Sequence, residues 1–266
     1  MRLSLLGTQG WIPTGARETT CFAVDDGERL IVVDAGTGFR RLVTPPFRRL
    51  VEDRAEIHLL LTHYHLDHVC GLAYAPAILA GRRLTVHAPA PELTGVDPAE
   101  ALSGLIRQPY NPKPWHELAG VELRLLHAGV NDLAGHRVGV RAQRHSDTSV
   151  AYRLDDALVV ATDTAVDPAT VEFAAGAGVL LHESWYCGDG PGANVPAALR
   201  PGYAAHSEAR AVARLAVEAR VGRLVLIHLN PLHDETDHAA MAAVARGVCP
   251  VAEIRPDGDE ITLADA

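Results

Sequence analysis

Residues 63–68 have the sequence His-Tyr-His-Leu-Asp-His and place four potential metal ligands within one short segment. The segment follows the apolar run 57–61, which predicts a buried strand ending at the edge of a sheet. Alternate side chains of an extended chain point the same way, so His63 and His65 can face one metal ion. Asp67 and His68 lie beyond the strand, where the chain can curl around a second ion. Two adjacent ions are suited to splitting bonds with water, so this segment predicts a hydrolytic site.

The composition predicts one folded chain with an acidic surface. Of the 266 residues 48% are hydrophobic and 21% are charged, which allows a large core and argues against global disorder. The net charge of −9 argues against a broad basic surface for long nucleic acids. No run is long and apolar enough for a membrane span, and the first residues do not have the pattern of a signal peptide. The four cysteines form no CxxC pair, so we expect reduced thiols and a cytoplasmic location.

Strands and helices are expected to alternate along the chain, which predicts an α/β protein. Residues 88–120 are rich in proline and are expected to form one helix and a loop over the active face. No Gly/Ser-rich linker occurs, so we expect a single domain over residues 1–266. The expected strands are 3–6, 21–24, 30–33, 57–62, 84–87, 121–126, 137–143, 149–154, 157–162, 179–182, 224–227 and one within 254–263; the expected helices are 72–80, 98–107, 169–175, 207–219 and 236–246.

Three more polar residues follow apolar strands. His145 follows residues 137–143, Asp163 ends the run 158–162, and His228 ends the run 224–227. Strand ends deliver side chains to a shared edge of a sheet, so these residues are candidate ligands of the same metal site. His182 also ends a strand, and we expect it to have a structural role beside the site.

The complete set resembles the metallo-β-lactamase superfamily, whose fold is a four-layer αββα sandwich with the metals at one edge of the sheets. The resemblance implies that Asp34 supports the metal-binding loop by hydrogen bonds. Mixed histidine and carboxylate ligands suit two Zn²⁺ ions, with Mn²⁺ or Fe²⁺ as alternatives. The resemblance assigns His63, His65 and His145 to the first metal, Asp67, His68 and His228 to the second, and Asp163 to both as a bridge.

Further segments resemble the tRNase Z and phosphodiesterase branch of that superfamily. They are LSLLGTQGWIPTGARETTC near the start of the chain, LLHESWY, and AAHSEARAVARLA. In that branch a glutamate and a histidine form a pair beside the metals, which implies this role for Glu183 and His206. A carboxylate can orient an imidazole that then protonates the leaving group. Asp67 is expected to take the proton of the attacking hydroxide while it also binds metal.

One departure from that branch limits the substrate. Enzymes that cut tRNA precursors carry a long arm, which the bacterial short forms insert between the third histidine and the bridging aspartate. Here the interval between His145 and Asp163 is long enough for only two short strands. The Gly-rich loop 188–192 is short and acidic. We therefore expect a small or cyclic phosphodiester, a nucleotide or a short RNA as substrate, and no long nucleic acid or membrane as partner.

The resulting hypothesis is a metal-dependent hydrolase that uses a hydroxide bridging two metal ions, acting as a phosphodiesterase. Three alternatives stay open at this point: a tRNA 3′-processing endonuclease, a thioester or lactone hydrolase, and a non-catalytic metal- or ligand-binding protein. The family resemblance alone suggests a homodimer.

Overall fold

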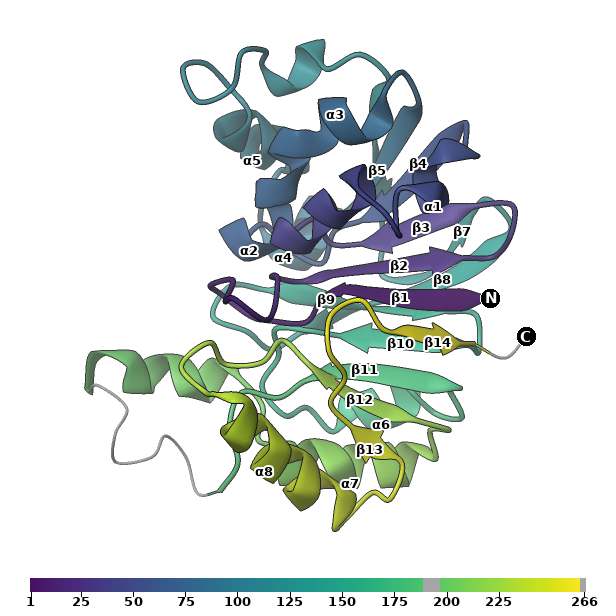
Figure 1. The fold of residues 1–266 in the computed structure, drawn as a ribbon. Coiled ribbons are helices and arrows are strands. Elements are labelled where there is room, and N and C mark those ends of the chain that lie inside the picture. Colours follow the sequence, from purple (N-terminus) through teal and green to yellow (C-terminus); the bar gives the residue numbers. More distant parts are fainter. Residues whose placement is uncertain (189–196, 264–266) are drawn as a thin grey trace. The chain divides into compact units, whose positions relative to one another are not determined.

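The computed structural model describes residues 1–188 and 197–263. The chain divides into two compact units, each containing one seven-stranded sheet (Figure 1). Unit 1 consists of Met1–His127 and Pro256–Thr262, and unit 2 of Ala128–Arg255 and Leu263–Ala266. The single domain expected over residues 1–266 stays a prediction.

The sheet of unit 1 has the strand order β14-β1-β2-β3-β4-β5-β6. Neighbouring strands are antiparallel from β14 to β3 and parallel from β3 to β6. Leucine, valine and isoleucine side chains of these strands pack against the helices in one core. The strands are β1 (Arg2–Gly7), β2 (Cys21–Asp25), β3 (Leu30–Val33), β4 (Glu56–Leu60), β5 (Arg83–Pro89), β6 (Val121–Leu126) and β14 (Glu260–Thr262); the helices are η1 (Thr37–Val43), α1 (Arg49–Glu52), α2 (Leu66–Val69), η2 (Cys70–Tyr74), α3 (Ala75–Leu79), α4 (Pro91–Thr94), α5 (Pro98–Leu105) and η3 (Trp115–Glu117).

The sheet of unit 2 has the order β13-β12-β11-β10-β9-β8-β7. Neighbours are antiparallel from β7 to β10 and parallel from β10 to β13, so β8, β10, β11 and β12 all run in one direction. The apolar face of α7 packs on this sheet beside α8 (Figure 1). The strands are β7 (Gly129–Leu133), β8 (His136–Gln143), β9 (Ser149–Leu154), β10 (Leu158–Ala161), β11 (Val179–Glu183), β12 (Leu224–Ile227) and β13 (Ala252–Glu253); the helices are α6 (Ala169–Phe173), η4 (Ala197–Ala205), α7 (Ala209–Ala219) and α8 (Glu235–Arg246).

The predicted strands are confirmed, but several details were wrong. Strand β13 was not expected, because two residues are too few to show an apolar pattern. The short helices α4 and η3 were not expected beside the one helix predicted in residues 88–120. Strand β7 was not expected, because its side chains are mostly exposed and lack an apolar run. The helix expected at 72–80 is split into η2 and α3, because Pro76 fits the first turn of a helix but not its interior. The helix expected from residue 207 begins at Ala209 and is capped by Glu208, whose carboxylate accepts the Ala211 N–H. Residues 189–192 of the Gly-rich loop lie outside the described residues. Among the described helices none is long and apolar enough to cross a bilayer.

Two histidines on neighbouring strands of unit 1 are expected to make the free energy of unfolding depend on pH. Nδ1 of His58 on β4 lies 3.2 Å from Nε2 of His87 on β5. Burial, aided by the charge of His58, lowers the pKa of His87 from 6.5 to about 4. Between pH 6.5 and about pH 4, His87 therefore binds a proton in the unfolded chain but stays neutral in the folded chain. The free energy of unfolding falls as the pH drops through this range.

We expect His87→Gln to remove about 2 kcal/mol of the stability difference between pH 7 and pH 5. The measurement is urea unfolding at both pH values. His116→Gln is the matched control, because the side chain of His116 is 73% exposed. An unchanged pH dependence in His87→Gln would contradict this assignment.

Candidate metal centre

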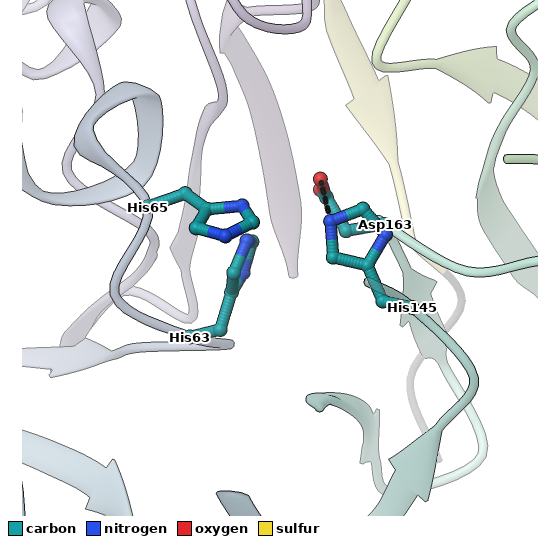
Figure 2. Close-up of side chains that lie close together, drawn as sticks. All are labelled: His63, His65, His145 and Asp163. Atoms are coloured by element: carbon teal, nitrogen blue, oxygen red, sulfur yellow. Dashed lines mark ion pairs between the residues drawn. The ribbon is translucent and has the colours of Figure 1, made fainter. Parts of the chain in front are cut away.

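The histidine-rich segment of unit 1 links the end of β4 to α2. His63 is 1% exposed and His68 is fully buried. The ring centroids of His63 and His65 are 4.5 Å apart, and those of His63 and His68 are 4.3 Å apart. Figure 2 shows the first two rings turned toward each other. The segment thus brings together the imidazoles that the sequence singled out in this half of the chain.

Asp34 holds this segment in place by hydrogen bonds. It follows β3, is fully buried, and has a positive φ of 58°, which aspartate tolerates better than most residues. Its carboxylate accepts hydrogen bonds from the N–H of Thr62 (2.8 Å), the hydroxyl of Thr62 (2.8 Å) and Nδ1 of His68 (2.7 Å). Burial raises the pKa of Asp34, and the charge and hydrogen bond of His68 oppose that rise. The hydrogen-bonding role expected for Asp34 is confirmed.

These hydrogen bonds select the tautomers of two histidines. The Thr62 hydroxyl donates to Asp34 and lies 3.1 Å from Nδ1 of His63, so its oxygen accepts a hydrogen bond from that nitrogen. Nδ1 of His68 donates to Asp34 in the same way. In both rings Nε2 then carries the lone pair. Histidine ligands of metals are held by such hydrogen bonds at the second nitrogen, so this half of the chain fits a metal site.

A loop near the start of the chain reaches Asp67. The backbone N–H of Trp11, a residue with a φ of 59°, donates to Oδ2 of Asp67 over 2.7 Å. Asp257 ties this loop at both ends, because its carboxylate accepts the N–H (3.0 Å) and hydroxyl (2.7 Å) of Thr8 and the N–H of Glu18 (2.6 Å). No sequence pattern predicted these contacts, which join residues up to 249 positions apart.

Gly36 packs against the backbone of the histidine-rich segment and leaves no room for a side chain. A Cβ atom at this position would overlap the carbonyl oxygen of Asp67 and lie 2.7 Å from that of Thr20. We expect Gly36→Ala to lower the free energy of unfolding by about 3 kcal/mol. Gly104→Ala in α5 is the control, since a Cβ there meets nothing within 4 Å, and we expect it to raise stability by about 0.5 kcal/mol. Equal unfolding free energies for the two variants, measured in urea, would refute the packing argument.

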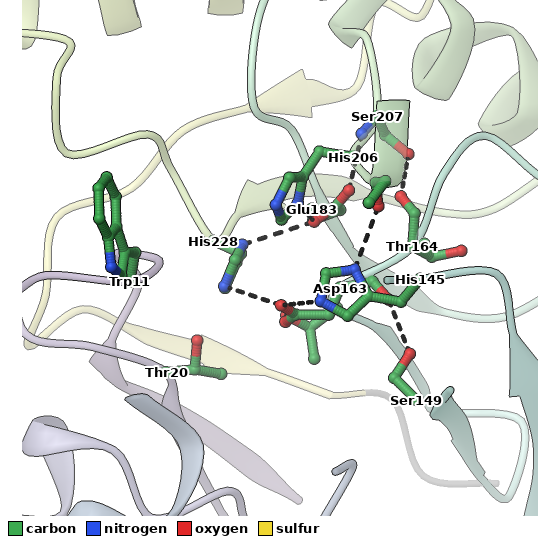
Figure 3. Close-up of polar contacts among 12 residues, drawn as sticks. Trp11, Thr20, His145, Ser149, Asp163, Thr164, Glu183, His206, Ser207 and His228 are labelled. Atoms are coloured by element: carbon green, nitrogen blue, oxygen red, sulfur yellow. Dashed lines mark hydrogen bonds and ion pairs between the residues drawn. The ribbon is translucent and has the colours of Figure 1, made fainter. Parts of the chain in front are cut away.

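In unit 2 the candidate residues lie where parallel-running strands end. His145, Asp163 and His228 follow β8, β10 and β12, and Glu183 is the last residue of β11. Oδ1 of Asp163 lies 3.4 Å from Nε2 of His145 and 3.2 Å from Nε2 of His228 (Figures 2 and 3). The hydroxyl of Thr162 donates to the other Asp163 oxygen over 2.7 Å. The sheet therefore gathers these side chains at one edge, as predicted.

In both of these histidines Nδ1 lies next to a polar oxygen. Nδ1 of His145 donates to the carbonyl oxygen of Ala205 (3.2 Å), and Nδ1 of His228 lies 3.5 Å from a Glu183 oxygen. Both Nε2 atoms consequently face Asp163. Burial lowers the pKa of His145, which favours the neutral form that binds metals.

Glu183 forms the pair with His206 that the resemblance implied. The glutamate is fully buried and accepts hydrogen bonds from Nδ1 of His206 (2.8 Å) and the N–H of Ser207 (2.7 Å) (Figure 3). Burial alone would raise the pKa of Glu183, but the charge and hydrogen bond of His206 lower it to about 2. Donor atoms of Asp163, Glu183, His206 and His228 all lie within 4.8 Å of one another.

His182 lies apart from these donors. Its ring is fully buried on β11, and Nδ1 donates to the backbone oxygen of Glu183 over 2.9 Å. Burial lowers its pKa, which favours the neutral ring. This agrees with the structural role that the sequence suggested.

Backbone strain marks several of the same positions. Asp34, Asp163 and His228 have φ values of 58°, 50° and 49°, a region that residues with a Cβ rarely adopt. Each follows directly or closely on a buried strand. Such strain persists where surrounding structure enforces it, often at functional sites, which supports a common role for these strand ends.

Residues 29–229 match the family model of the β-lactamase superfamily domain. The chain belongs to the metallo-β-lactamase superfamily. It is 27% identical to the ribonuclease Z of Methanopyrus kandleri over 301 positions, covering 96% of this chain and 95% of that one. It is 28% identical to the ribonuclease Z of Prochlorococcus marinus over 289 positions, covering 87% of both. The metallo-β-lactamase fold protein YhfI from Bacillus subtilis superimposes with a TM-score of 0.75 at 18% identity, covering 98% of this chain and 99% of that one.

These likenesses confirm several predictions from the sequence. The αββα metallo-β-lactamase fold and the ribonuclease Z-like branch are confirmed, and the chain is a hydrolase of that superfamily. Its histidine and aspartate clusters could hold metal.

Proposed function

We propose that this metallo-β-lactamase superfamily hydrolase cleaves small phosphodiesters at a centre of two metal ions. The observation that carries the proposal is a hydrogen bond at Nδ1 of His63, His68 and His145, which leaves Nε2 of each ring to bind metal. Nδ1 of His228 likewise lies 3.5 Å from a carboxylate oxygen of Glu183. The resemblance to the superfamily implies which residues would form this centre. Its ligands would be His63, His65 and His145 for one ion, Asp67, His68 and His228 for the other, and Asp163 for both; Zn²⁺ suits this set best.

Bound there, two divalent ions would activate water at neutral pH and neutralise charge on the phosphoryl oxygens. In the proposed reaction Asp67 takes the proton of the attacking water, while the N–H of Trp11 fixes its Oδ2. His206 donates a proton from Nε2 to the leaving oxygen, because Glu183 holds its Nδ1. The pKa of Glu183 is lowered to about 2, so its carboxylate accepts this hydrogen bond in the ionised form.

A small substrate is favoured by the chain between His145 and Asp163. Its residues, all of them described, form two short strands, β9 and β10, joined by a turn. The alignment with the ribonuclease Z of M. kandleri spans 301 positions, more than the 266 residues of this chain, so that relative carries segments without a counterpart here. The net charge of −9 also disfavours a long polyanion.

The test is hydrolysis of bis(p-nitrophenyl) phosphate and 2′,3′-cyclic nucleotides by protein loaded with Zn²⁺ or Mn²⁺. We expect turnover of both substrates and its loss on chelation, with two ions per chain by elemental analysis. Turnover of thioesters or lactones without any phosphodiester hydrolysis would overturn the proposal.

A second candidate is tRNA 3′-end processing, favoured by the ribonuclease Z relatives. Cleavage of a precursor tRNA with a higher kcat/KM than a cyclic nucleotide would select it over the first. A cytoplasmic location and a homodimer stay predictions.

A further inference from the structure

Trp185 lies against the proposed acid in unit 2, and neither the sequence nor the proposed reaction gave it a role. Its indole is 6% exposed. The indole stacks on the ring of His206 with centroids 4.3 Å apart and an angle of 13° between the planes. It is also stacked at 5.4 Å and 28° on His228. One aromatic face therefore borders both the proposed acid and a proposed metal ligand.

The stack restrains a motion that hydrogen bonds leave open. The bond from Nδ1 of His206 to Glu183 fixes one atom of the ring at 2.8 Å, but the ring can still tilt about that contact. The parallel indole face opposes this tilt, because tilting would separate the two π surfaces or drive them together. The His206 ring is held 5.6 Å from that of His228, at 22° to it.

We propose that Trp185 is a positioning residue that holds the plane of His206, and so aims its Nε2 at the leaving group of the substrate. This inference rests on the proposed function for its catalytic consequence, although the stack itself does not. General acids need an accurate direction of proton transfer, and a small displacement of a catalytic group lowers turnover more than it lowers substrate binding.

The backbone around Trp185 allows the side chain to be tested alone. Its N–H donates to the carbonyl oxygen of Ser207 over 2.9 Å, and the N–H of Ala209 donates to that of Tyr186 over 2.9 Å. The N–H of Ser207 reaches Glu183 independently of the indole. A substitution at position 185 therefore keeps the backbone pairing and the Glu183–His206 contact while it removes the stack.

The experiment compares Trp185→Leu, Trp185→Phe and Trp115→Leu in the zinc-loaded protein. Trp115 is the matched control, since it is a tryptophan with 7% exposure in the core of unit 1. We expect Trp185→Leu to lower kcat about tenfold at nearly constant KM and metal content. Trp185→Phe keeps an aromatic face and is expected to restore most of the turnover. Trp115→Leu should lower the melting temperature without this selective loss of kcat.

An NMR measurement separates the stack from the reaction. In histidine-labelled protein, ring-current shielding by Trp185 should move the ring protons of His206 upfield, with the resonances assigned from His206→Gln. The shielding should disappear in Trp185→Leu and persist in Trp185→Phe, even if no phosphodiester proves to be a substrate. The proposal is wrong if the His206 resonances do not respond to Trp185→Leu, or if Leu and Phe at this position lower kcat equally.

Discussion

Replacing Asp163 with asparagine is expected to lower phosphodiester hydrolysis at least about 100-fold and to reduce the bound metal below two ions per chain. Even outer contacts of metal ligands are worth about 10- to 100-fold, and this carboxylate is proposed to bind both ions directly. Its Oδ1 lies 3.4 Å from Nε2 of His145 and 3.2 Å from Nε2 of His228. Without this negative charge, the electrostatic repulsion between the two bound ions would be less well compensated.

Asparagine is the informative replacement at this position. Asp163 has a φ of 50°, and asparagine adopts this conformation as readily as aspartate, whereas alanine would add backbone strain. Asp156→Asn is the matched control in the same unit, because its side chain is 74% exposed and pairs only with Arg153 among the ion pairs described. Elemental analysis and turnover are measured together. Two retained ions and turnover within about threefold of the parent would remove Asp163 from the metal centre.

His206→Ala is expected to lower kcat by about 100-fold while both metal ions remain bound. The reason is geometric: Nδ1 of His206 is engaged by Glu183, which leaves Nε2 to transfer the proton. Substrates with a good leaving group, such as p-nitrophenolate, need little protonation. We therefore expect a smaller loss on bis(p-nitrophenyl) phosphate than on a cyclic nucleotide with an alkoxide leaving group.

This difference between substrates distinguishes an acid from a scaffold. His233→Ala is the control, a half-buried histidine on the loop after β12 whose pKa is lowered by burial. An equal loss on both substrates, or loss of metal from His206→Ala, would show that His206 acts as a ligand or a support. In that case Glu183 would be left as a structural carboxylate.

The sequence predicted the parts of the site that depend on local order. An apolar run followed by a polar residue identified His145, Asp163 and His228 at strand ends, because a sheet sends such residues to its edge. The spacing in residues 63–68 also predicted neighbouring imidazoles, because alternate side chains of an extended chain point the same way. Helix boundaries were less accurate where residues had other partners: Ser207 donates its N–H to Glu183 and its hydroxyl to Thr164 instead of capping α7.

The contacts that the sequence did not predict join distant segments. The stack of Trp185 on His206 depends on how two loops lie side by side, and no periodicity records it. The hold of Asp257 on Thr8 and Glu18 is equally invisible in a linear pattern. Trp185 and Asp257 support candidate residues or a loop that contacts one. Neither was a candidate itself, because aromatic and acidic residues at such positions are common in ordinary cores and turns.

The assembly of unit 1 from two distant stretches sets an order of events during protein synthesis. Unit 2 lies almost wholly between them, so the ribosome completes residues 128–255 before it makes β14 and Asp257. Until then the sheet of unit 1 lacks its edge strand, and the loop that carries Trp11 lacks the carboxylate that ties its ends. Before that point the contact of the Trp11 N–H with Asp67 lacks the support of Asp257. A nascent chain would carry His63, His65 and His68 early and gain the support for the loop that contacts Asp67 last.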